Sequence, residues 1–384
     1  MNIAVDATIL GFDNPTGVSV AFAQVLDKLL NDPRDRYTLN YFSWRSRSPV
    51  RAKLELDWKE RCVLRRCSWL PYRIYKVLER TIRFPWRWLF GSDAEVSLFF
   101  YHNLPTGVAG KKVVVIHDMV YMACPETMAD ATRRMHDRAL IKTCDQADMI
   151  VTVSQFSKSE IITYLGIDEK KIRIMYNGVD ATRFSPSVGK VEIESLRNRL
   201  DLLSPYFLYV GTLEPRKNLV RLIAAYQALR ETRAGDVPDL VIAGGVGWCY
   251  DEIFAQVQRS GLGDHVRFTG YVDDADLPAL MKGCFAFVFP SLYEGFGLPP
   301  LEAMACGVPV LTSDTAALPE VVGEDAVLVD PESVESITDG LLRLLTDAEL
   351  RQSLAERGPA RARNFSWQAA ADTMRDVFAE VLAS

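Results

Sequence analysis

The sequence predicts an α/β protein of two domains, each built on a doubly wound parallel sheet. The chain has 384 residues, which is too long for one ordinary hydrophobic core and suits two domains of common size. In both halves, short apolar runs alternate with longer stretches of helical period, as expected for strands that helices cover on both faces. Between the halves, residues 181–189 are polar and lack an apolar period, which indicates a linker.

In the first half, apolar runs of strand length predict four strands, at residues 3–7, 113–116, 149–153 and 172–175. The stretches between them are long enough to hold crossover helices, so the strands are expected to be parallel. We assign residues 1–185 to this first domain.

In the second half, the same pattern predicts six strands, at residues 207–210, 240–243, 266–270, 286–289, 308–311 and 326–329. We assign residues 186–364 to this second domain. Residues 365–384 predict a last helix that starts after an N-cap at Ser366 and is expected to pack back on the first domain. Its apolar face consists of Trp367, Ala370, Met374, Val377, Phe378 and Val381.

The bulk composition is that of a globular protein. Apolar residues make up 48% of the chain and the formal net charge is -6, which does not favour nucleic acid as a partner. The seven cysteines form no CxxC pair and no Cys/His ligand set, so a reducing compartment is expected. The first residues lack the pattern of a signal peptide, and no apolar run reaches the length of a bilayer span. These features predict a cytoplasmic protein.

Residues 61–90 differ from the rest of the chain, because eight Arg or Lys residues accompany one acidic residue, Glu79, and are interleaved with aromatic residues. One interpretation is an interfacial element that places cations on anionic headgroups and aromatic rings at the boundary between water and lipid. A second is a solvated basic helix whose aromatic residues belong to the core, and a third is base stacking on nucleic acid. The sequence leaves the first two open.

The strongest local signal is the segment GTLEPRKN at 211–218, which follows a predicted strand and precedes a helical pattern. Arg216 and Lys217 therefore fall on a turn from strand to helix. The unpaired N–H groups at a helix start favour an anion, and two cations add full charges, so a diphosphate is the expected ligand. The alternative is a solvated Arg-Lys pair beside a capping Asn218.

A second signal is the segment YEGFGLPPLEAMACG at 293–307. Pro300 suits the first turn of a helix and Gly307 suits its end, so Glu302 is expected in the first turn, where the helix dipole would keep it ionised. Glu294 lies in the loop before this helix. Two carboxylates suit either acid-base catalysis, as in glycoside hydrolases, or binding of sugar and ribose hydroxyls.

These two segments together closely resemble the large group 1 family of retaining glycosyltransferases, and in particular bacterial mannosyltransferases of surface-polysaccharide assembly such as that of O-antigen. The spacing of Glu294 and Glu302, with seven residues between them, matches the glutamate pair of that family. The resemblance covers essentially the whole chain. It implies the GT-B fold, in which two Rossmann-like domains face a central cleft.

The resemblance also implies roles for individual residues at the donor. Arg216 and Lys217 would hold the donor diphosphate, Glu294 would contact hydroxyls of the transferred sugar, and Glu302 would contact the ribose. The backbone around Phe296, Gly297 and Leu298 would follow the sugar and phosphates, and Gly270-Tyr271-Val272 would line the nucleobase, with Val272 in contact with it.

In the first half, the resemblance assigns His117, at the end of a predicted strand, to the donor sugar and Gly17 to a turn that approaches the diphosphate. By itself a histidine at a strand end is more often structural. Asp118 suits a helix cap equally well. Ser154 and Ser157 also fit a family pattern, and helix capping is at least as good an explanation for them.

The mechanism that the resemblance implies is a front-face displacement with retained configuration, completed when the cleft closes. The catalytic residues would be His117, Arg216, Lys217 and Glu294, with no metal and no cofactor. The expected donor carries a hexose, and the segment 113–125 favours GDP-mannose. The expected acceptor is a glycan, either free or linked to a lipid at the inner face of the cytoplasmic membrane. The rival classes are a nucleotide-sugar epimerase on the same fold and a non-catalytic nucleotide-sugar binder.

Overall fold

The computed structural model describes residues 1–384 except 12–16, 44–57, 102, 128–138, 234 and 236. The chain divides into two compact units, which we describe separately. Unit 1 comprises Met1–Ala123, Met128–Gly178 and Trp367–Ser384, and unit 2 comprises Cys124–Thr127 and Val179–Ser366. Unit 2 therefore starts before the expected boundary at residue 186 and includes the predicted linker.

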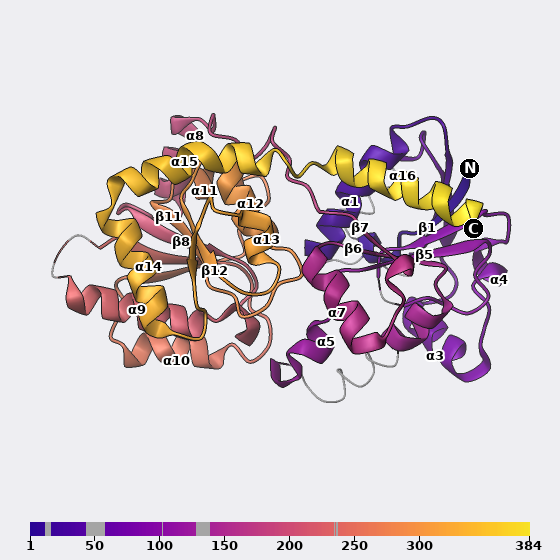
Figure 1. The fold of residues 1–384 in the computed structure, drawn as a ribbon, viewed down its shortest axis with the longest axis horizontal. Coiled ribbons are helices and arrows are strands. Elements are labelled where there is room, and N and C mark those ends of the chain that lie inside the picture. Colours follow the sequence, from indigo (N-terminus) through magenta and orange to yellow (C-terminus); the bar gives the residue numbers. More distant parts are fainter. Residues whose placement is uncertain (12–16, 44–57, 102, 128–138, 234, 236) are drawn as a thin grey trace. The chain divides into compact units, whose positions relative to one another are not determined.

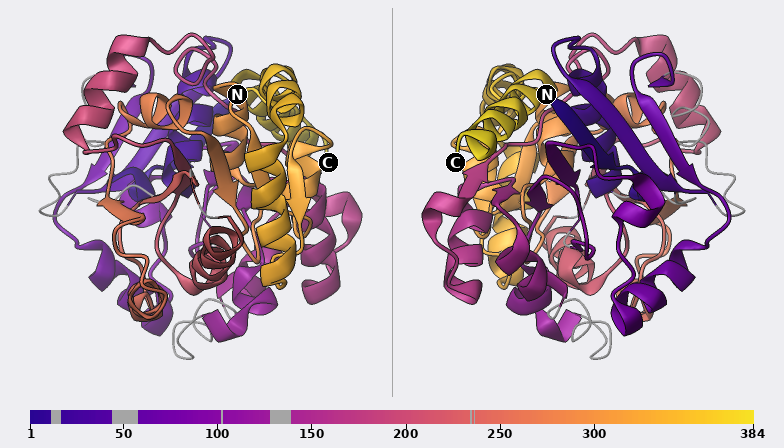
Figure 2. Two further views of the ribbon diagram at one scale, coloured as in Figure 1. Left: turned by 90° about the vertical axis from the view of Figure 1, so that its left-hand side faces the viewer. Right: turned by 90° about the vertical axis from the view of Figure 1, so that its right-hand side faces the viewer.

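Unit 1 is built on a seven-stranded parallel sheet with the strand order β3-β2-β1-β4-β5-β6-β7. The right-hand view of Figure 2 shows its first strands, in indigo and purple, side by side. The order reverses beside β1, which defines the switch point of a doubly wound sheet. The strands are β1 Asn2–Asp6, β2 Arg36–Phe42, β3 Val63–Cys67, β4 Val96–Phe99, β5 Lys111–Ile116, β6 Met149–Thr152 and β7 Ile172–Ile174.

Three of these strands, β2, β3 and β4, were not predicted. In β2, the polar Thr38 and Asn40 interrupt the apolar run, although Asn40 is buried. The strand β3 lies at the edge of the sheet, and its sequence VLRRC carries two arginines, as a surface segment would. Only the pairing with neighbouring strands identifies such segments as strands.

Helices flank this sheet, and the last helix of the chain is one of them (Figure 1). The helix α16 packs against α1, and its predicted apolar face is buried. Arg375 on α16 donates to the Lys28 carbonyl at 3.1 Å, near the end of α1. The helices are α1 Gly17–Leu30, α3 Tyr72–Ile82, α4 Arg87–Phe90, α5 Val120–Ala123, α7 Gln155–Leu165 and α16 Trp367–Ala383.

Unit 2 is built on a six-stranded parallel sheet with the order β10-β9-β8-β11-β12-β13. This is the 3-2-1-4-5-6 order of dinucleotide-binding folds, with the switch point between β8 and β11. Together with the sheet of unit 1, it confirms the predicted fold class. The strands are β8 Tyr206–Val210, β9 Asp239–Ala243, β10 Val266–Gly270, β11 Ala286–Phe289, β12 Val310–Ser313 and β13 Val327–Val329.

Helices cover both faces of the second sheet (Figure 1). On one face α9 packs against α10 and α14, and on the other α12 packs against α11 and α15. The helices are α8 Lys190–Arg199, α9 Leu219–Thr232, α10 Asp251–Arg259, α11 Leu277–Lys282, α12 Leu298–Ala305, α13 Leu318–Val322, α14 Val334–Thr346 and α15 Ala348–Ala362.

The strand β12 begins later than the predicted range 308–311 and continues further. Pro309 precedes it, because proline has no N–H for the ladder. Its last residues, Thr312 and Ser313, are polar but fully buried. Their hydroxyls donate to the carbonyls of Phe289 at 2.9 Å and Ser291 at 2.6 Å, which satisfies them inside the core.

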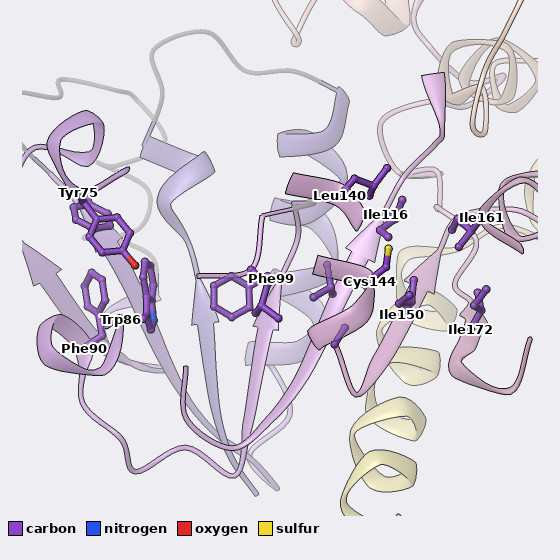
Figure 3. Packing of buried hydrophobic residues seen from close by; sticks show 14 of the residues in the cluster. Tyr75, Trp86, Phe90, Phe99, Ile116, Leu140, Cys144, Ile150, Ile161 and Ile172 are labelled. Carbon is purple, nitrogen blue, oxygen red and sulfur yellow. The ribbon is translucent and has the colours of Figure 1, made fainter. Parts of the chain in front are cut away.

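The basic and aromatic segment 61–90 divides between core and surface. Figure 3 shows Tyr75, Trp86 and Phe90 lying together in the core of unit 1, as the second interpretation required. Trp69 and Trp88 are instead 65% and 69% exposed. The second interpretation, a solvated basic helix whose aromatic residues belong to the core, is therefore correct for Tyr75, Trp86 and Phe90 but not for these two exposed tryptophans.

Among the described residues, no helix is long and apolar enough to cross a bilayer. All seven cysteines are free.

Candidate active site

The strongest candidate site lies at the carboxyl edge of the sheet of unit 2, where the strand order reverses. The chain leaves β8 toward Arg216 and Lys217, and leaves β11 toward Tyr293 and Glu294. Because β8 and β11 are neighbours on opposite sides of the switch point, their loops meet above the same edge. Two segments far apart in sequence are thereby brought together.

Arg216 holds these two loops to each other. It lies in a 3-10 helix of one turn, Pro215–Lys217. Its Nη1 donates to the Tyr293 carbonyl at 2.7 Å and to Glu294 Oε2 at 3.0 Å. Its Nη2 and Nε donate to Glu214 Oε1 at 2.7 and 3.1 Å. A guanidinium bound on two sides in this way is fixed in orientation.

Lys217 meets the same carboxylate from the other side. Its Nζ donates to Glu294 Oε1 at 2.5 Å and lies 5.2 Å from the centre of the Phe289 ring. Ser291 Oγ also donates to Glu294 Oε1, at 2.7 Å. Lys217 is 9% exposed and Glu294 8%, so the alternative of a solvated Arg-Lys pair is wrong.

The charges of this network shape the ionisation of its members. Burial by itself would raise the pKa of Glu294, but Arg216 and Lys217 attract the carboxylate more strongly and lower its pKa to about 2. Burial and the neighbouring Arg216 lower the pKa of Lys217, and Glu294 opposes this shift. Glu294 is therefore an anion at every physiological pH.

The hydrogen bonds of Glu294 leave it little capacity as a general base. A carboxylate offers about four acceptor positions, and three are taken by Arg216, Lys217 and Ser291. About one position remains for a ligand hydroxyl. Lys217, with three N–H groups and one acceptor among the described residues, retains donors for an anion.

The loop after Glu294 turns sharply into α12. Gly297 has φ +104, and a Cβ there would lie 2.7 Å from Leu318 Cδ2, so glycine is required. The N–H groups of Gly297 and Leu298 have no acceptor within the described part of the chain. The side chain of Phe296 is buried and packs against the ring of Phe365.

Glu302 does not lie where it was expected. The helix α12 begins at Leu298, earlier than Pro300, so Glu302 falls in the second turn, beyond most of the effect of the dipole. Burial, only partly opposed by Arg183, raises the pKa of Glu302 to about 8. The prediction that the helix start keeps Glu302 ionised is wrong. At neutral pH its carboxyl is mostly protonated and has both a donor and an acceptor for a diol.

The ends of β8, β9 and β10 carry glycines at the same edge of the sheet. The N–H of Gly244 donates to the Gly270 carbonyl at 2.8 Å, and a Cβ on Gly244 would lie 1.9 Å from the Gly211 carbonyl oxygen. Beyond Gly270, Tyr271 is 63% exposed and Val272 is buried. The segment predicted to line a nucleobase therefore lies at the end of the edge strand β10.

His117 lies in unit 1, directly after β5. Burial lowers the pKa of its imidazole to about 4, and a hydrogen bond to the Phe100 backbone opposes this shift. The ring is therefore neutral at physiological pH. Its Nε2 is buried and has no hydrogen-bond partner among the described residues, which a purely structural histidine would have.

The other candidates of unit 1 have structural explanations. Asp118 Oδ1 accepts from the Val120 N–H at 3.2 Å, at the start of α5. Ser154 caps α7 by accepting from the Ser157 N–H at 3.0 Å, and Ser157 Oγ donates to the His117 carbonyl at 3.2 Å. Gly17 is the first residue of α1 and exposed, and the loop residues before it, 12–16, lie outside the described residues.

Two residues of the network were missed by the sequence analysis. Glu214 is 3% exposed and orients Arg216, and Ser291 is fully buried and orients Glu294. Asn218 was interpreted as a cap, but its Nδ2 donates to the carbonyls of Pro290 at 2.9 Å and Pro331 at 2.6 Å. A charged residue two positions before Arg216 was the available signal for Glu214.

Across the described residues, no group of three or more His, Cys, Asp and Glu side chains is placed to hold a metal ion.

The cationic site at the switch point of a doubly wound sheet suits an anionic nucleotide ligand. Residues 192–361 match the family model described as glycosyl transferases group 1, and residues 44–183 match glycosyltransferase family 4. The chain belongs to the group 1 glycosyltransferases.

The relatives of this chain include two mannosyltransferases of Escherichia coli. The chain is 38% identical to O-antigen chain mannosyltransferase B over 258 residues, which cover 67% of each protein. It is 32% identical to the serotype-specific mannosyltransferase WbdA over 279 residues, which cover 72% of this chain and 34% of WbdA. The matched region thus spans about a third of WbdA.

Solved structures agree on the fold. Alr3699/HepE of Anabaena in complex with UDP and glucose superposes with a TM-score of 0.77 at 17% identity, covering 99% of this chain and 100% of that protein. Sucrose-phosphate synthase of Thermosynechococcus elongatus superposes with a TM-score of 0.76 at 20% identity, covering 100% of this chain and 99% of that protein.

Proposed function

We propose that this glycosyltransferase moves mannose from GDP-mannose to a glycan acceptor with retention of the anomeric configuration. The observation that carries the proposal is the buried network in which Arg216 and Lys217 converge on Glu294 at the switch point of unit 2. The names of the relatives, which include mannosyltransferases of the O-antigen chain, favour mannose.

The chemistry of the network suits a sugar diphosphate. When the bond from sugar to phosphate breaks, negative charge gathers on the leaving diphosphate. Arg216 and Lys217 stabilise that charge as fixed cations in a water-poor site, where preorganised charges act most strongly. The N–H groups of Gly297 and Leu298 at the start of α12 add donors for the phosphates.

The carboxyl groups bind hydroxyls in this proposal. Glu294, with about one acceptor position left, holds a hydroxyl of the transferred sugar, and Glu302, mostly protonated at neutral pH, holds the ribose diol. Phe296, Gly297 and Leu298 follow the donor with their backbone, and Val272 lies against the nucleobase. His117 and Gly17 remain predicted donor-side contributions of unit 1.

The reaction requires no metal in this proposal, because the two cations supply the counter-charge that a divalent ion supplies elsewhere. We place the enzyme in the cytoplasm, peripherally on the inner face of the cytoplasmic membrane, with a lipid-linked glycan as acceptor.

The test is a panel of GDP-, UDP-, ADP- and dTDP-sugars incubated with the protein, with and without a mannose-containing oligosaccharide. We expect an α-configured product from GDP-α-mannose only, formed equally in EDTA and identified by NMR. Transfer from another donor contradicts the assignment of GDP-mannose. An inverted product contradicts retention, and loss of turnover in EDTA contradicts a reaction without metal. Isomerisation of the donor without acceptor indicates an epimerase, and binding without turnover indicates a silent binder.

A further inference from the structure

The surface of unit 1 formed by residues 63–88 exposes cations and large apolar side chains together. This basic-apolar surface includes five arginines, six large apolar residues and two small hydroxyl residues, with no exposed carboxylate. Its members are Val63, Arg66, Ser68, Trp69, Arg73, Ile74, Val77, Arg80, Thr81, Ile82, Arg83, Arg87 and Trp88.

The single acid of the segment is removed from this surface. Glu79 is 5% exposed and lies on the inner side of α3, where its Oε1 accepts from Lys142 Nζ at 2.9 Å. The next acid along the chain, Asp93, is bound to Arg65 at 2.7 Å. Both carboxylates are therefore engaged by cations that do not belong to the basic-apolar surface.

The helix α3 has two faces of different chemistry. Tyr75 and Glu79 lie on one face and are buried. Arg73, Ile74, Val77 and Arg80 share the opposite face, at helical spacings of three and four residues, and are exposed. The outer face mixes cations with β-branched apolar residues, which a helix exposed only to water does not require.

Aromatic rings fill the core beneath α3 and α4. Figure 3 shows Tyr75, Trp86 and Phe90 in this core. Their ring centres lie 5.2, 5.9 and 5.4 Å from that of Phe42. Because Phe90 packs into this core from α4, Trp88 on the same helix remains at the surface, 69% exposed.

We infer that the basic-apolar surface docks on an anionic lipid bilayer. Arginines bind phosphate headgroups while their aliphatic stems lie in the interface, and tryptophan prefers the same depth. A polyanion such as nucleic acid would use the cations but would gain little from Ile74 and Val77. This inference rests on the proposed location at the membrane and names the surface of the protein that contacts the lipid. It does not depend on the identity of the donor.

The experiment measures co-sedimentation of the full chain with vesicles of phosphatidylcholine, with or without about one third phosphatidylglycerol. Wild type is expected to bind only the anionic vesicles. The variant R73Q/R80Q/R87Q is expected to bind them roughly 100-fold more weakly, the scale of three lost headgroup attractions. The variant W69S/I74Q/V77Q is expected to bind about 10-fold more weakly, even at high salt, where charge attraction is screened.

Control variants change exposed cations and exposed aliphatic residues of unit 2. The variants K190Q/R233Q/R363Q and V191Q/L203Q alter exposed side chains and are expected to bind as wild type does. Thermal denaturation checks that every variant is folded.

The inference is overturned if wild type does not bind anionic vesicles at low salt, or if the controls lose binding as much as the surface variants. It is also overturned if W69S/I74Q/V77Q binds vesicles normally while heparin competes fully, since a polyanion would then be the partner. Turnover on a soluble oligosaccharide is expected to be unchanged in both surface variants. Absent turnover in wild type with intact vesicle binding contradicts the proposed function alone.

Discussion

At the scale of residues, Glu294 organises the candidate site by accepting from Arg216, Lys217 and Ser291 at once. Such a cluster is costly to assemble, because charges lose their hydration on burial and recover it only through good geometry. The chain places this cluster at the edge where doubly wound sheets bind ligands, which suits a role beyond stability.

The cations are expected to matter for the rate more than for substrate affinity. Arg216→Ala or Lys217→Ala should lower kcat by roughly two to three orders of magnitude, the effect of losing one preorganised donor. Steady-state kinetics on the folded fraction measures this, with the exposed Arg233→Ala as control. Near-normal kcat in either variant would contradict the assigned site.

Glu294 also predicts a pH-dependent stability. Its pKa is about 2 in the folded chain against an ordinary 4.5, so its stabilisation is present above pH 4.5 and is lost as the pH falls toward 2. Glu294→Gln should cost about 3 kcal/mol at pH 7, because the buried Lys217 and the partly buried Arg216 lose their partner, and less at pH 3. Urea unfolding measures this, with the exposed Glu194→Gln as control. A difference that does not depend on pH would refute the ion pairing.

Glu302 predicts the opposite trend. Its pKa is about 8 in the folded chain against 4.5, so the folded state keeps a proton that the unfolded state loses, and stability falls as the pH rises from 4.5 through 8. Glu302→Gln should therefore raise Tm relative to wild type more at pH 8 than at pH 5. Differential scanning calorimetry at both pH values measures this. An equal shift at both would mean that Glu302 is ionised in the folded chain.

At the scale of elements, the ends of β8 and β9 approach each other so closely that only glycine fits. Gly244 has φ +150, and its missing Cβ would overlap the Gly211 carbonyl. A Cβ on the neighbouring Gly245 would instead meet no atom within 4 Å. Position 244 therefore requires glycine, whereas position 245 has space for a Cβ.

This contrast gives a matched pair of variants. Gly244→Ala should destabilise the chain by about 3 kcal/mol, because backbone strain and overlap add, and should weaken nucleotide binding. Gly245→Ala should change stability by less than about 1 kcal/mol. Urea unfolding and calorimetric titration with GDP measure the two effects. Equal behaviour of the two variants would show that the strand ends can separate freely.

At the scale of the whole molecule, the two units differ in how the chain builds them. Unit 2 is almost continuous from Val179 to Ser366, whereas unit 1 needs Trp367–Ser384 from the other end of the chain. The buried face of α16, with Trp367, Met374 and Phe378, completes the core of unit 1.

The units should therefore behave differently when separated. A fragment of residues 179–366 is expected to fold and bind nucleotide. A fragment of residues 1–178 lacks α16 and is expected to aggregate or bind a hydrophobic dye. Circular dichroism and GDP titration measure both, and adding residues 367–384 as a peptide should rescue the second fragment. A well-folded 1–178 fragment would mean that α16 contributes little to unit 1.

The sequence by itself determined the fold class, the apolar face of α16, and the pairing of Arg216 and Lys217 on a turn from strand to helix. These features depend on local periodicity and on residue types that nearby backbone geometry selects. The charged edge strand β3 and the polar end of β12 were not predictable in this way, because their environment comes from distant partners.

Only the tertiary structure decided which residues of the site contact one another. It brought Glu294 between the two cations, buried Glu214 and Ser291 behind them, and moved the pKa of Glu294 and Glu302 in opposite directions. It also divided the segment 61–90 into a core and an exposed surface. The physical reason is that burial and long-range charge are set by which strands become neighbours, and a linear sequence does not contain those distances.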